Sequence, residues 1–162
     1  MPMKTFPSLA ASLGALTLAL LAPLAAQADG PRQALRSPAP ASFEQECGAC
    51  HVAFPPAMLP AASWQRLSAN LGKHFGVDAS LDAATAKELS TWLIDNAGTH
   101  RRVVEAPPED RISRAAWFVR KHDEVSARTW KLPAVKSAAN CSACHPKAQE
   151  GDFDEHAVRI PR

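Results

Sequence analysis

The chain lacks strongly charged segments. It has no run of basic residues longer than a pair such as Arg101-Arg102, and its 18 Lys and Arg side chains nearly balance 16 Asp and Glu. Nucleic-acid-binding proteins gather positive charge on one face or along one helix, so nucleic acid is not the expected partner. Charges of both signs mix in segments such as 109–114, which is typical of a solvated helix face.

Two further absences concern fold and chemistry. No alternating apolar run is long enough for a sheet, so we expect an all-α protein. No nucleophile motif and no paired-carboxylate site can be recognised, and this argues against an enzyme. The sequence therefore favours a helical binding or carrier protein over an enzyme.

Residues 1–28 have the features of a secretory signal peptide. Lys4 precedes an apolar run, and Ala26-Gln27-Ala28 supplies a small-residue cleavage site. An uncleaved membrane anchor is disfavoured because Pro23 breaks the run and no stop-transfer charges follow. Residues 29–41 are rich in proline and lack periodicity, so we expect a flexible leader. The mature protein is expected to be exported.

All four cysteines occur in two copies of one motif. The first copy is Cys47-Gly48-Ala49-Cys50-His51 and the second is Cys141-Ser142-Ala143-Cys144-His145. Cys-x-x-Cys-His is the attachment signature of c-type haem: the two thiols reach the two vinyl groups, and the histidine ligates the iron. The motifs predict two covalently bound haem c groups, held by Cys47, Cys50, Cys141 and Cys144, with proximal ligands His51 and His145.

Three other interpretations of the cysteines are weaker. A disulfide framework does not require a histidine directly after each pair. A four-cysteine zinc site commonly has a short spacer between its pairs, whereas Cys50 and Cys141 lie far apart in the sequence. A thioredoxin-like dithiol needs a βαβ setting, which the sequence does not predict.

Apolar periodicity and capping residues predict four helices. The first starts at Ser42 as its N-cap and carries Cys47 and Cys50 on one turn. The others are expected over 61–76, with Gly76 as C-cap, over 82–98, with Asp82 as N-cap and Gly98 as its stop, and over 109–130. Pro107 and Pro108 mark a boundary. We therefore expect an N-terminal haem domain over 42–104 and a C-terminal one over 105–162.

The sixth ligand of each iron should come from a buried helix face. His74 continues the apolar stripe of Trp64, Leu67 and Leu71, and His122 continues that of Ile112, Ala115 and Val119. Each candidate lies 23 positions from the histidine of its motif. We expect the remaining candidates not to be ligands: His100 and His156 in exposed positions, and Met58 as a packing residue. Core packing is the expected role of Trp64, Trp92, Trp117 and Trp130.

Several segments in order resemble the dihaem cytochrome c family of exported bacterial electron carriers. They are "FEQECGACHVAFPPAMLPAASW", "KHFG", "WFVRKHDEV" and "WKLPAVKSAANCSACH", followed by "GDF" and "IP". The resemblance implies an N-terminal domain like a class I cytochrome c and a smaller C-terminal haem segment. It implies two low-spin haems with His51 and His74 on one and His145 and His122 on the other. Unlike the class I monohaem pattern, the first half has no methionine in its distal region.

The resemblance also implies a function in the periplasm. The expected protein takes electrons from a membrane cytochrome b or quinol-linked donor and passes them to a soluble haem protein. In one class of the family this acceptor is an oxygen-binding monohaem cytochrome, the sphaeroides haem protein. The alternative is a dihaem peroxidase or reductase with one open iron coordination site, which would require His74 or His122 not to be a ligand. A haem-based gas sensor is less favoured because no output domain is recognisable.

Overall fold

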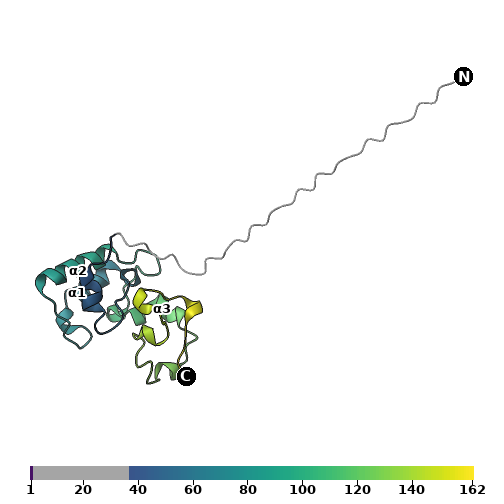
Figure 1. Cartoon of the computed structure of the whole chain (residues 1–162). Coiled ribbons are helices and arrows are strands. Elements are labelled where there is room, and N and C mark those ends of the chain that lie inside the picture. Colours follow the sequence, from purple (N-terminus) through teal and green to yellow (C-terminus); the bar gives the residue numbers. More distant parts are fainter. Residues whose placement is uncertain (2–36) are drawn as a thin grey trace. The chain divides into compact units, whose positions relative to one another are not determined.

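The computed structural model describes Met1 and residues 37–162 (Figure 1). In this part of the chain the secondary structure is helical, and the only bridge of β type is an isolated one between His74 and Val77. The all-α prediction is therefore confirmed. The expected signal peptide, 1–28, and most of the expected leader, 29–41, lie outside the described residues. No helix within the described part is long and apolar enough to cross a membrane.

The described chain contains four α-helices and eight turns of π or 3-10 type. The α-helices are α1 (Ala61–Ser68), α2 (Ala83–Asp95), α3 (Ala116–Lys121) and α4 (Ala127–Trp130). A π-helical turn, η1 (Phe43–Cys47), precedes them. The 3-10 turns are η2 (Pro56–Met58), η3 (Leu71–Lys73), η4 (Pro108–Asp110), η5 (Ile112–Arg114), η6 (Cys141–Ala143), η7 (Ala148–Glu150) and η8 (Glu155–Ala157).

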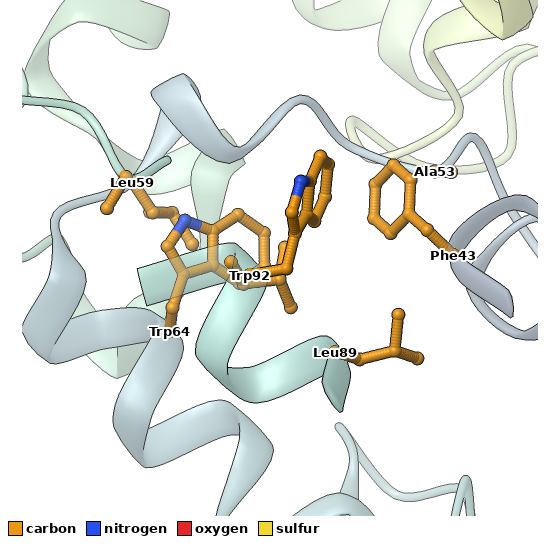
Figure 2. Close-up of a cluster of buried hydrophobic side chains, with 8 residues drawn as sticks. Phe43, Ala53, Leu59, Trp64, Leu89 and Trp92 are labelled. Atoms are coloured by element: carbon orange, nitrogen blue, oxygen red, sulfur yellow. The ribbon is translucent and has the colours of Figure 1, made fainter. Parts of the chain in front are cut away.

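A cluster of aromatic and aliphatic side chains forms the core between α1 and α2 (Figure 2). The Phe43 ring packs against Trp92 at a centroid distance of 4.7 Å. The Trp64 indole N–H donates a hydrogen bond of 2.7 Å to the Pro56 carbonyl, which satisfies its polar atom inside the core. The prediction of core packing is confirmed for Trp64 and Trp92, which are both buried. The cluster holds the residues before Cys47 against α2.

Leu89 of α2 is buried in this cluster, with 3% of its surface exposed. We expect Leu89→Ala to lower the free energy of unfolding by about 2–5 kcal/mol, because it removes apolar contacts and leaves a cavity. Denaturant unfolding of the haem-loaded protein, followed by circular dichroism, measures this loss. Val104→Ala is the control, since that side chain is exposed and its removal should change stability by less than about 0.5 kcal/mol. Equal losses in both variants would contradict the assigned core.

The helix caps agree with the sequence in one case and not in another. Asp82 caps α2 as predicted: its carboxylate accepts hydrogen bonds from the backbone N–H groups of Ala84 and Thr85 at 3.0 and 3.1 Å. The prediction for Ser42 is wrong, because its hydroxyl donates to the Glu88 carboxylate of α2 at 2.9 Å and caps nothing.

The first cysteine motif does not lie on one helical turn. The π-helical turn η1 ends at Cys47, and the N–H of its C-cap Gly48 donates a hydrogen bond of 3.0 Å to the Glu44 carbonyl. Cys50 follows in a non-helical turn. The predicted helix over both cysteines is therefore wrong, and the chain has left the helix before it reaches His51.

The predicted helix over 61–76 is shorter than expected. α1 ends at Ser68, and the 3-10 turn η3 follows, so His74 lies in a loop and not on a helix. Phe75 and Gly76 then have φ values of 49° and 96°, a left-handed conformation that stops any helix. Gly76 is thus a turn residue beyond His74 and not a helix C-cap. α2 also ends early, at Asp95, three residues before Gly98.

The predicted helix over 109–130 is divided into η4, η5, α3 and α4. Glu109 and Asp110 have φ values of 58° and 55°, which a continuous helix does not allow. The Ser126 hydroxyl caps the separate helix α4 by accepting from the Thr129 N–H at 3.2 Å. The apolar stripe predicted to be buried does not include Val119, because this residue is 57% exposed. Its neighbour Phe118 is buried instead. The boundary between 42–104 and 105–162, and the class I character of the first of these domains, stay predictions.

Candidate haem centres

The structure brings His51 and His74 together. His51 follows the turn after η1, and His74 is the residue directly after η3. Their ring centroids are 6.1 Å apart, and the angle between the ring planes is 22°. The His51 Nδ1–H donates to the Val52 carbonyl at 2.6 Å. This hydrogen bond fixes the ring and leaves Nε2 as the nitrogen with a free lone pair.

His122 and His145 form a second pair. His122 is the C-cap of α3, and His145 comes directly after Cys144 of the second motif. Their ring centroids are 6.2 Å apart, and the ring planes meet at 72°. The His122 Nδ1–H donates to the Phe118 carbonyl at 2.9 Å, one helical turn earlier. Here too the hydrogen bond selects Nε2 as the nitrogen that can bind a metal.

Both distances fit one iron atom between two imidazoles. Metal–nitrogen bonds of about 2.0 Å on each side, and about 1.1 Å from each nitrogen to its ring centroid, place the two centroids about 6.2 Å apart. Two histidines in direct hydrogen-bond contact would lie closer together. A haem macrocycle would supply four ligands to such an iron, so two facing histidines would complete its coordination.

The polar atoms and charges of the pairs also suit metal binding. The buried Nδ1 atoms of His74 and His145 have no hydrogen-bond partner within residues 37–162. Burial lowers the pKa of His74, and the facing His51 lowers it further. Burial and the facing His122 likewise lower the pKa of His145. The neutral imidazoles that result are the form in which histidine ligates a metal.

The four cysteines are free thiols in this structure. Burial, followed by the charges of Glu44 and Glu46, raises the pKa of Cys47 to about 11. Burial also raises the pKa of Cys141 and of Cys144. No disulfide joins the four cysteines, so each thiol can form a thioether bond to a haem. Among the described residues no three His, Cys, Asp or Glu side chains converge, so the cysteine pairs are not arranged as a zinc site.

One phenylalanine packs against each of the four histidines, which the sequence analysis did not predict. Two rings are stacked: Phe54 on His51, with centroids 4.9 Å apart, and Phe118 on His122, with centroids 4.0 Å apart. The other two are edge-on: Phe75 on His74 at 4.8 Å and Phe153 on His145 at 5.5 Å. The short sequence distances between these phenylalanines and histidines could have indicated the contacts. The apolar-stripe argument instead assigned Val119 to the buried face beside His122.

The other candidates lie elsewhere, as expected from the sequence. His100 is exposed, and its Nδ1 accepts a hydrogen bond of 3.3 Å from the Arg102 N–H. His156 is exposed as well, and its Nδ1 lies 2.9 Å from the Asp154 carboxylate. Met58 belongs to η2, where its carbonyl accepts a hydrogen bond of 3.3 Å from the Trp117 indole. None of these three residues faces one of the motif histidines.

Comparisons with known proteins identify dihaem cytochromes c as relatives. A family model described as dihaem cytochrome c matches residues 43–153. The structure is similar to the X-ray structure of the dihaem cytochrome c sb-DHC from Shewanella baltica OS155, with 39% identity, a TM-score of 0.66, and coverage of 75% of this chain and 92% of that chain. It is also similar to the crystal structure of DHC purified from Rhodobacter sphaeroides, with 46% identity, a TM-score of 0.60, and coverage of 68% and 94%. A search of curated protein sequences gave no significant match.

The fold and the two facing histidine pairs define a helical protein with two haem centres. The chain belongs to the dihaem cytochrome c family. It carries two covalently bound haem c groups, and the cysteine pairs of both attachment motifs are present. Membership of this family favours an electron carrier over an enzyme.

Proposed function

We propose that this protein is a periplasmic electron carrier in which both haem irons are ligated by two histidines. Cys47 and Cys50 would hold the first haem, with His51 and His74 as its axial ligands. Cys141 and Cys144 would hold the second, with His145 and His122. The observation that carries this proposal is the pair of ring distances, 6.1 and 6.2 Å, between histidines that face each other.

The residues of the chain support electron transfer in two ways. Bound haem supplies a one-electron couple, and two histidines give a lower reduction potential than a histidine and a methionine. The Nδ1–H groups of His51 and His122 are already held by backbone carbonyls, so the rings need little rearrangement when the charge of the site changes. The stacked Phe54 and Phe118 rings restrict the same two histidines further.

The alternative function, a dihaem peroxidase or reductase, needs an open coordination position. Neither comparison supports such an enzyme. Both His74 and His122 lie opposite the motif histidine at the distance that ligation requires, which favours the carrier.

The proposed direction of electron flow rests on the family resemblance. The donor would be a membrane cytochrome b or a quinol-linked protein, and the acceptor a soluble haem protein, such as an oxygen-binding monohaem cytochrome c. The proposed location follows from residues 1–28, which have the features of a cleaved signal peptide.

Carbon monoxide tests the proposed coordination. We expect the absorption spectrum of the oxidised protein to contain only low-spin haem, and the reduced spectrum to stay unchanged when carbon monoxide is added, because both sixth positions are filled by histidine. The measurement is a spectrum of the exported protein in both redox states, before and after the gas. A high-spin band, or a shift with carbon monoxide, would reveal an open iron and support the enzyme instead.

A further inference from the structure

The loop that carries His74 is covered by a segment from the second half of the chain. The guanidinium of Arg111 lies 4.2 Å from the centroid of the Phe75 ring. The same Phe75 ring packs edge-on against His74, with the centroids 4.8 Å apart. A cation over an aromatic face is an attractive contact. Contacts therefore run from Arg111 through Phe75 to His74, which belongs to the first candidate haem centre.

Phe75 and the two residues before Arg111 have unusual backbone conformations. Phe75 has a φ value of 49°, and Glu109 and Asp110, directly before Arg111, have φ values of 58° and 55°. A left-handed conformation costs free energy in a residue other than glycine, and it persists only when surrounding contacts maintain it. Such residues concentrate at functional sites.

Ion pairs hold the covering segment in place. Asp110 accepts two hydrogen bonds from Arg66 of α1, at 2.8 and 2.6 Å. Glu109 pairs with Arg111 at 3.0 Å and with Arg114 at 2.6 Å. Since one carboxylate serves two guanidinium groups, Glu109, Arg111 and Arg114 together retain one positive charge. This charge lies beside the distal side of the first site.

We infer that Arg111 positions His74 and raises the reduction potential of the first haem, a role that rests on the proposed ligation of that haem by His74. The oxidised haem carries one more positive charge than the reduced haem. A nearby cation therefore destabilises the oxidised state and favours the reduced state. No cation is recorded over Phe118 or Phe153, which pack on the two histidines of the second site within the described residues.

The test is a spectroelectrochemical titration of the haem-loaded protein. Arg111→Gln should lower the potential of the first haem, so that the ratio of reduced to oxidised haem at the wild-type midpoint falls about threefold, which equals ~30 mV for one electron. The potential of the second haem should not change. Arg111→Lys keeps the charge and should restore most of the shift. His74→Met identifies the first haem, because methionine as a ligand raises the potential.

Arg114→Gln is the matched control. It removes a guanidinium from the same segment and from the same carboxylate, but this residue is not the one over Phe75. We expect its shift to be less than half that of Arg111→Gln. Equal shifts in the two variants, or an unchanged potential in Arg111→Gln, would overturn the inference and leave the proposed function intact. If His74→Met moves neither potential, His74 is not a ligand, and both the inference and the proposed ligation are wrong.

Discussion

His74→Ala is expected to open the iron of the first haem and to leave the second haem unchanged. The substitution removes the imidazole that faces His51 at 6.1 Å, and the described structure places no other histidine opposite that ring. An iron with one strong axial ligand becomes high-spin when oxidised and binds carbon monoxide when reduced. The oxidised absorption spectrum should show one high-spin and one low-spin haem, and titration should show one carbon monoxide bound per chain.

His100→Ala is the control for this result. It removes the same side chain from an exposed position, so both haems should stay low-spin and indifferent to carbon monoxide. His122→Ala is the matching experiment for the second site and should open the other iron. If His74→Ala kept two low-spin haems that do not bind carbon monoxide, the assignment of His74 would be wrong. Covalent attachment should survive in all three variants, because none of them changes a cysteine.

The motifs with fixed spacing could be predicted from the sequence alone. Cys-x-x-Cys-His has a chemical meaning that does not depend on the surrounding fold, so both haem groups follow from ten residues. The pairing of His74 with His51 and of His122 with His145 was predicted from a different signal, because His74 and His122 each end an apolar stripe. The structure brings each of them opposite its motif histidine, although neither residue lies within a helix as that argument assumed.

The helices themselves were predicted less well, and the reason is physical. α2 was found because Asp82 caps it and its apolar side chains pack in the core, so local and tertiary signals agree. The segments 61–76 and 109–130 have helical periodicity, but there the chain turns to bring His74 opposite His51 and His122 opposite His145. Tertiary packing around these histidines overrides the local helix propensity of the two segments. Left-handed residues at Phe75, Glu109 and Asp110 break the helices where the two segments meet.

The contact of Phe153 with His145 and that of Arg111 with Phe75 could not have been predicted from spacing. Phe153 lies eight residues beyond His145, and Arg111 lies far from Phe75 in the sequence. Periodicity identifies which side chains share a face of one element, but it gives no information on which elements meet. These contacts arise from the loops, whose paths depend on tertiary packing.

The ferric protein should give two distinct low-spin signals in electron paramagnetic resonance. The ring planes are 22° apart in the first pair and 72° apart in the second. Nearly parallel imidazoles interact with the same iron d orbital and separate it in energy from its partner. Nearly perpendicular imidazoles interact with one orbital each and leave the two close in energy. The first haem should therefore give a rhombic signal, and the second a more anisotropic signal with a higher maximum g value.

The difference between the two ring-plane angles comes from the local structure around His74 and around His122. His122 is held by its hydrogen bond to the Phe118 carbonyl and by the stacked Phe118 ring, both on α3. His74 lies in a loop, where the Phe75 ring packs edge-on against it. The two histidine pairs thus have different angles between their ring planes.

Frozen samples of the oxidised wild type, His74→Ala and His122→Ala would assign the signals. His74→Ala should remove the rhombic signal, and His122→Ala should remove the anisotropic one. Two overlapping rhombic signals in the wild type would contradict the ring angles, and the opposite pattern of losses would reverse the assignment. Because the proposed ligands are two histidines at both sites, a difference that follows these substitutions would come from how the backbone orients the rings.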